Sequence, residues 1–131
     1  MIPSSITFMQ LSLATLTSLP AVLGLGCYSS GPTWFEVSQD HDGYYNTASL
    51  LCGEMGSQFF YPGDERAGCL AGSYRHLDWK IRYNGKKQHT TMDPDDCKTA
   101  VQIEMYGCEH GSEQNHGDWW YHLDPNPGKD W

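Results

Sequence analysis

The side chains best suited to chemistry gather near the end of the chain, in and just before the run DWWYHLDPNPG (residues 118–128). Aromatic rings occur there beside carboxylates, amides and histidines. Such groups suit a sugar, because a ring covers its C–H face while carboxylates and amides fix its hydroxyls. The candidate glycan-binding residues are Asn115, His116, Asp118, Trp119, Asp124 and Asn126. We expect Trp119 to stack on the ligand and the other five to hydrogen-bond to it.

Catalytic chemistry is less well supported by the residue pattern. The 6 histidines lack the i, i+4 spacing of a metal-binding helix, and the chain has no GxSxG motif and no phosphate-cradling glycine loop. The cluster QDHDG (39–43) resembles a set of metal ligands, but helix capping explains it better. A ribonuclease needs an acid, a base and an arginine. The spacing of the available candidates does not favour one: Arg75, His76, His89 and Glu104. We predict a protein that is not an enzyme, with no metal and no cofactor.

The amino-terminal segment, residues 1–24, has no charged side chain. It is apolar but interrupted by polar residues and Pro20, which is typical of a secretory signal peptide; an uncleaved anchor is the alternative. Residues 25–131 are then expected to form a single domain. The chain has 16 acidic and 8 basic residues, a net charge of -8. This balance argues against nucleic acid and anionic membranes as partners, because both require phosphate neutralisation.

The cysteines indicate an oxidising, extracellular location. All five lie after the predicted leader, and they are the candidates for structural disulfides: Cys27, Cys52, Cys69, Cys97 and Cys108. An odd number leaves at least one thiol free or paired between chains. Cys97 and Cys108 are separated by roughly 16 Å along one predicted helix, too far for a disulfide. We therefore expect one of them to join this helix to the sheet or to the N-terminal strand.

Two stretches show helical periodicity. One begins at Tyr44, with Asp40 or Asp42 as a candidate cap, and runs to about Met55. The other follows the predicted N-cap Asp93, with proline at its first position. The segments with strand character are residues 32–37, 58–63, 67–73, both arms of a hairpin over 74–91 that turns at Asn84–Gly85, and 118–124.

This order of elements predicts an α+β fold with an antiparallel sheet. In the strand over 118–124, Trp119 and Tyr121 point to one face while Trp120 and His122 point to the other. Both faces are apolar, so we expect one helix on each face of the sheet, an αβα sandwich. Trp120 and Tyr121 are then predicted to lie in the core.

Four segments and the leader resemble the small secreted glycan-binding lectins of fungi, such as that of the shaggy ink-cap mushroom (Coprinus comatus). The segments are GCYSSGPTWFEV, DHDGYYNTASLLC, DPDDCKTAVQIEMYGC and GDWWYHLDPNPG. The resemblance covers essentially all of residues 25–131 and rests on cysteine placement and segment order. It carries no sugar-contact motif, so the candidate residues above come from side-chain chemistry alone.

The resemblance implies a single-domain αβα sandwich and a lectin without enzymatic activity. It also implies recognition of N-glycan termini bearing N-acetylgalactosamine, with glycans and glycoproteins of cell surfaces as partners. A homodimer formed through an edge strand is consistent with it. A cysteine-rich secreted effector or killer-toxin relative is the alternative, and a small secreted ribonuclease is a less favoured one.

Overall fold

The long helices begin and end close to where the sequence predicts them. The computed structural model describes residues 25–55 and 58–131, so the predicted signal peptide lies outside the described residues. Helix α3 spans Tyr44–Met55, and α4 spans Pro94–Gly107. The Asp93 carboxylate caps α4 by accepting the Asp95 N–H at 3.0 Å. Asp40 does not cap α3, because its carboxylate accepts the Ser73 N–H at 2.8 Å.

The segment predicted as the first strand is instead a short helix, α2 (Trp34–Ser38), followed by the 3-10 turn η1 (Gln39–His41). A capping box starts this helix. The Glu36 N–H donates to the Thr33 hydroxyl at 3.1 Å, and the Thr33 N–H donates to the Glu36 carboxylate at 2.9 Å. The strand prediction was wrong because it followed the aromatic and β-branched composition and overlooked the Thr-x-x-Glu spacing.

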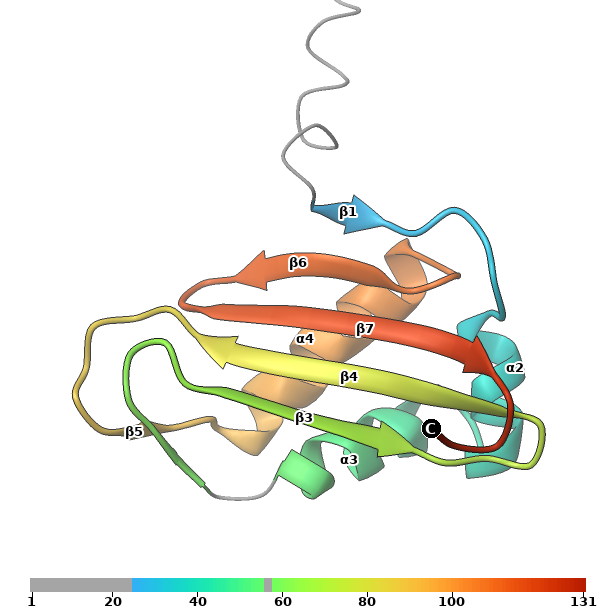
Figure 1. The fold of residues 1–131 in the computed structure, drawn as a ribbon, viewed down its shortest axis with the longest axis horizontal. Coiled ribbons are helices and arrows are strands. Elements are labelled where there is room, and N and C mark those ends of the chain that lie inside the picture. The colour runs from blue at the N-terminus through green and yellow to red at the C-terminus, as the bar shows by residue number, and fades with distance from the viewer. Residues whose placement is uncertain (1–24, 56–57) are drawn as a thin grey trace, which may run out of the picture.

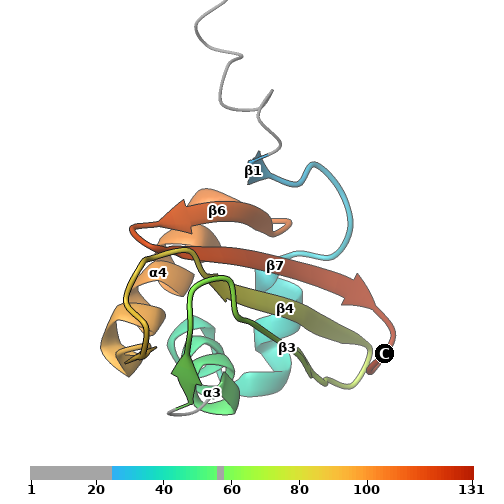
Figure 2. The same ribbon diagram turned by 60° about the vertical axis from the view of Figure 1, so that its left-hand side comes forward.

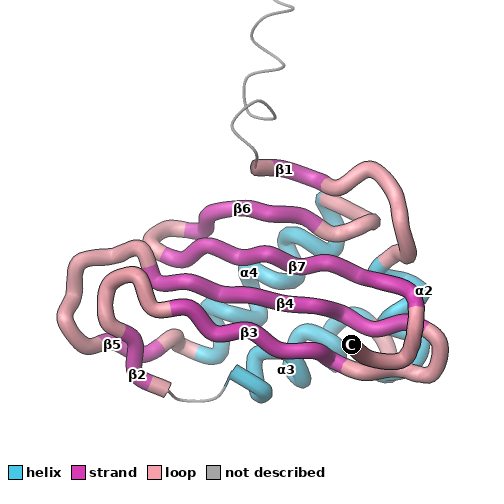
Figure 3. Tube along the Cα trace, viewed as in Figure 1, coloured by secondary structure: helices cyan, strands magenta, loops and turns pink. Residues whose placement is uncertain are grey.

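Five antiparallel strands form the main sheet, in the order β1-β6-β7-β4-β3 (Figures 1 and 3). Their bounds are Gly26–Cys27 (β1), Glu65–Leu70 (β3), Arg75–Tyr83 (β4), Ser112–His116 (β6) and Trp119–Pro127 (β7). A second, two-stranded sheet pairs β2 (Phe59–Phe60) with β5 (Thr90–Thr91). The α+β class and the antiparallel sheet are therefore confirmed.

The tight hairpin occurs at a different turn from the predicted one. The chain does not reverse at Asn84–Gly85, because β5 pairs with β2 rather than with β4. The two-residue turn is Gly117–Asp118, which joins β6 to β7 with His116 opposite Trp119. Gly117 has φ 63°, which suits glycine at the first position of a type II′ turn. The polar residues SEQNH, which lie outside the strands predicted above, form β6.

Both long helices lie on the same face of the main sheet, side by side (Figures 1 and 2). The Cys52–Cys97 disulfide joins α3 to α4 directly. The expected helix on each face is therefore replaced by two layers, helices and sheet. The physical reason lies in the strands: β4 buries Leu77 and Ile81 toward the helices and turns Asp78 and Lys80 away from them.

The second disulfide, Cys27–Cys108, ties β1 to the carboxyl end of α4. It confirms the expectation that a cysteine of this helix is joined to the sheet, through β1, a strand that the sequence did not predict. Cys97 and Cys108 do not pair with each other, as helical geometry required. Cys69 is the free cysteine, on edge strand β3.

Candidate functional site

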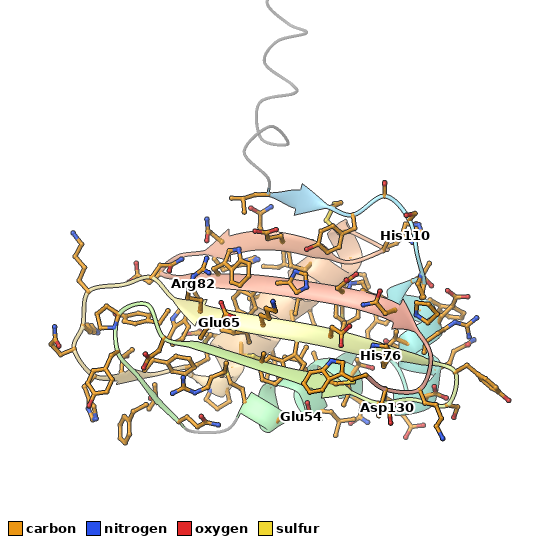
Figure 4. The ribbon with its side chains drawn as sticks, in the orientation of Figure 1. Glu54, Glu65, His76, Arg82, His110 and Asp130 are labelled. Atoms are coloured by element: carbon orange, nitrogen blue, oxygen red, sulfur yellow. A yellow bond between two sulfur atoms is a disulfide. The ribbon has the colours of Figure 1, made fainter. Side chains whose placement is uncertain are left out.

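The face of the main sheet turned away from the helices is the candidate site, and we call it the open face. Side chains at alternate positions of four strands (β3, β4, β6 and β7) and a tyrosine after β1 make up this face: Tyr28, Glu65, Cys69, His76, Asp78, Lys80, Arg82, Glu113, Asn115, Trp120, His122, Asp124 and Asn126. The viewer looks onto this face in Figure 4, where Arg82 and Glu65 lie at one end and His76 at the other.

Trp120 is at the centre of a row of planar groups at one end of the open face. The Arg82 guanidinium lies 4.2 Å from the centre of the indole ring. The His122 ring is stacked along the same strand, with 6.1 Å between ring centres. The indole N–H donates to the Glu113 carboxylate at 3.0 Å. These contacts fix the orientation of the indole without burying it completely.

Arg82 is held from both sides. Its Nη1 lies 3.3 Å from a Glu65 carboxylate oxygen, and its Nε donates to the Asn84 side chain at 3.2 Å. Register sets this arrangement, because Arg82 is directly opposite Glu65 on β3 and Trp120 on β7. A guanidinium has five N–H donors, so Arg82 keeps donors that these two contacts do not use and that a ligand on the open face could reach.

Tyr28 crosses from the N-terminal segment to reach β7. Its hydroxyl is 2.7 Å from His122 Nδ1, and its backbone N–H donates to the Gly111 carbonyl at 2.9 Å. Burial, followed by the Glu113 and Asp124 carboxylates, raises the pKa of Tyr28 to about 12. The phenol is therefore neutral at ordinary pH and serves as a hydrogen-bonding group.

A second network occupies the other end of the open face. Asn126 Nδ2 donates to Asp78 at 2.8 Å and to Asp124 at 3.1 Å, bridging two carboxylates. His76 is buried, with Nε2 3.1 Å from Asp78 and Nδ1 2.9 Å from the Gly128 carbonyl. The Trp131 indole N–H also donates to Asp78.

A shallow hollow of about 590 Å³ adjoins this second network at the edge of the sheet. Its lining residues include Gly68, Cys69, Asp130 and Trp131. Burial and the Asp78 carboxylate raise the pKa of the Cys69 thiol. The thiol is therefore protonated at neutral pH, which makes it a poor nucleophile.

The structure separates the six residues predicted from sequence into two groups. Asn115, Asp124 and Asn126 lie on the open face, Asn115 directly opposite Trp120. His116, Asp118 and Trp119 do not share that face. His116 is on the helix side, where its Nε2 is 2.6 Å from the buried carboxylate of Glu104.

Trp119 is half-buried and packs against the edge of the core. Its ring centre lies 4.9 Å from that of Phe60 and 4.8 Å from that of Tyr83. Asp118, in the β6–β7 turn, lines a separate hollow of about 470 Å³ with residues 83–87. The expected stacking role of Trp119 therefore has no geometric support, whereas Trp120, predicted in the core, lies on the open face.

The sequence reasoning missed Tyr28, Arg82, Glu113, Trp120 and His122. A usable signal was present for Trp120. The even-numbered positions that follow it along β7 are His122, Asp124 and Asn126, all polar. This alternation marks the even-numbered face as solvated and places Trp120 on it.

Comparison of the chain with known protein families and with curated proteins finds no match. Within the part of the chain that the structure describes, no helix is long and apolar enough to cross a membrane. Because no matching protein indicates a function, the site must be interpreted from its own geometry and chemistry.

Proposed function

We propose that this chain is a secreted carbohydrate-binding protein, a lectin, and that its ligand lies on the open face. The observation that carries the proposal is Trp120, an incompletely buried indole surrounded by hydrogen-bonding side chains on a sheet face that none of the described helices covers. Indole rings beside polar side chains recognise sugars because they offer apolar area together with directed donors and acceptors.

The solvent-exposed edges of the Arg82, Trp120 and His122 side chains would contact the sugar ring. The carboxylates of Glu113 and Asp124 flank this row and would accept hydrogen bonds from sugar hydroxyls. Mixed charge on the face suits a neutral, hydroxyl-rich ligand better than a polyanion. Following the family resemblance, we propose N-glycan termini bearing N-acetylgalactosamine as ligands, on glycoproteins of cell surfaces.

Secretion and dimerisation complete the proposal. Two disulfides are compatible with an extracellular protein. We propose a homodimer formed through β3, the longer of the two edge strands of the main sheet, whose outer side has no strand partner among the described residues. The mass of the protein in solution, measured by light scattering, would be twice that of one chain if this pairing occurs.

A glycan array probed with the oxidised wild-type protein tests the proposed function. We expect binding to a limited set of glycans, and at least about tenfold weaker binding by the Trp120→Ala variant. The matched control is Tyr74→Ala, which removes an exposed aromatic side chain outside the open face. The absence of any glycan signal at micromolar protein would rule out the lectin function.

One observation favours a second candidate function, cleavage of phosphodiesters. Glu113 and His122 are directly opposite each other, and Arg82 projects from the same face. A carboxylate base, an imidazole acid and a guanidinium are the groups that such a reaction needs. RNA cleavage by the wild type that is lost in Glu113→Gln would support it.

Growth inhibition that free sugar cannot block would instead favour the effector or killer-toxin alternative.

A further inference from the structure

Three side chains from β3 and β4 converge at the end of the open face away from Arg82. They are Cys69, His76 and Asp78, and one potential ligand atom of each lies within 4.8 Å of the others. His76 and Asp130 mark this end of the sheet in Figure 4. The strand register brings Cys69, His76 and Asp78 together, because it places Cys69 directly opposite Asp78.

The hydrogen bonds of His76 assign roles to its two nitrogens. Nδ1 lies 2.9 Å from the Gly128 carbonyl, which can only accept, so Nδ1 carries a proton. Nε2 lies 3.1 Å from a carboxylate oxygen of Asp78, another acceptor. With the proton on Nδ1, the Nε2 lone pair of the imidazole is directed toward the Asp78 carboxylate, so both groups can be ligands of one cation between them. A backbone carbonyl on the far nitrogen is the usual support of a metal-binding histidine.

The spacing of the three groups suits a tetrahedral ion. Ligand atoms about 2.0–2.3 Å from zinc lie roughly 3.3–3.6 Å apart at tetrahedral angles. The observed 3.1 Å between His76 Nε2 and Asp78 Oδ2 is close to this separation. The Cys69 sulfur lies within 4.8 Å of the other two ligand atoms, so we expect its side chain to rotate toward them when the ion binds.

The surrounding groups stabilise Asp78 as a ligand. Asn126 donates to its Oδ2 at 2.8 Å, and the Trp131 indole donates to its Oδ1. His76 is buried and Cys69 and Asp78 are half-buried, so the ligands are partly shielded from water. A cysteine sulfur that loses its proton when the metal binds, an imidazole and a carboxylate together favour zinc over the harder magnesium and calcium ions.

We propose that Cys69, His76 and Asp78 bind one zinc ion, with a fourth position open to water or to an exogenous ligand. This site differs from the sugar site proposed above and does not depend on it. The sequence predicted no metal, because the ligands come from two strands and have no compact spacing. The site also gives a role to the cysteine that the two disulfides leave over.

Zinc binding is tested by calorimetric titration of the full chain with zinc chloride, after a thiol assay has verified one free cysteine. We expect one ion per chain with micromolar or tighter affinity. Cobalt(II) in place of zinc should give a thiolate-to-cobalt charge-transfer band. Cys69→Ala and Asp78→Asn should each weaken binding at least about 100-fold, and Cys69→Ala should abolish the band.

Asp124→Asn is the matched control, because Asp124 is directly opposite Asp78, shares the Asn126 contact and lies outside the proposed ligand set. It should retain zinc affinity. No binding by the wild type would overturn the proposal, as would undiminished binding in folded Cys69→Ala. If that variant does not fold, equal affinity in Asp78→Asn and the wild type would overturn it, and so would failure of zinc to slow alkylation of Cys69.

Discussion

At the residue scale, Tyr28 joins the N-terminal segment to the centre of the open face. Its hydroxyl bonds to His122, and its ring packs edge-on against the same imidazole with 5.8 Å between ring centres. Because burial and, after it, the neighbouring carboxylates disfavour a phenolate, the neutral phenol is the form that the folded protein stabilises.

Tyr28 should therefore make stability sensitive to alkaline pH. Its pKa is about 12 in the folded protein against a usual value of 10.0. The folded protein thus keeps a proton that the unfolded chain loses, and this contribution to stability is complete below pH 10 and lost as the pH rises through 12. Titration of tyrosinate absorbance should show one late-ionising tyrosine fewer in Tyr28→Phe than in the wild type. Identical titration curves would contradict the assigned environment.

Gly68 is a second residue whose identity the packing determines. A Cβ at this position would lie 2.5 Å from the buried indole of Trp79, directly opposite on β4. We expect Gly68→Ala to lower the free energy of unfolding by about 1–3 kcal/mol, measured by urea denaturation. Gly53→Ala, in α3 where a Cβ meets no atom within 4 Å, should be neutral or stabilising. A neutral Gly68→Ala would show that the indole moves aside easily.

At the element scale, the Cys52–Cys97 disulfide holds α3 and α4 together across a sequence separation of 45 residues. Cross-linking a loop of that length stabilises a fold by roughly 4 kcal/mol in the chain-entropy description. We expect the Cys52→Ala/Cys97→Ala double variant to lose about 2–5 kcal/mol in urea denaturation, with Cys69→Ala as the control that breaks no disulfide. A loss below about 1 kcal/mol would indicate that helix packing alone holds the pair.

An element could be predicted from the sequence to the extent that neighbouring residues, rather than residues distant in the chain, determine it. Helix α4 could be placed from Asp93, Pro94 and its apolar stripe, because caps and periodicity are properties of neighbouring residues. The pairing of β5 with β2, and not with β4, depends on contacts distant in sequence. Local turn chemistry at Asn84–Gly85 was therefore misleading.

At the scale of the whole molecule, the sequence left open whether helices cover one face of the sheet or both. Strand β7 has aromatic residues on both faces, which suggested helices on both sides. Trp120 is accommodated without a second helical layer because Arg82, Glu113 and His122 contact it. Three of the six candidate site residues, Asn115, Asp124 and Asn126, consequently lie on the open face, while the residues around Trp120 could be found only once the register was known.

The two-layer architecture also explains why the site is on the sheet. The helices cover one face and bury the apolar side chains there, including Leu51, Val101 and Leu123. The opposite face is left with side chains that satisfy one another through hydrogen bonds and stacking. Such a face is stable in water and still offers donors and acceptors to a ligand.

The most direct test of ligand binding on the open face is the NMR response of the indole N–H groups. The protein would be titrated with a glycan selected on the array, and the Trp120 signal assigned with a Trp120→Phe variant. We predict that the Trp120 signal shifts on saturation, because its N–H donates to Glu113 within the proposed site. The signal of Trp34, which is fully buried, should not move. Saturation that leaves the Trp120 signal unchanged would contradict binding on the open face.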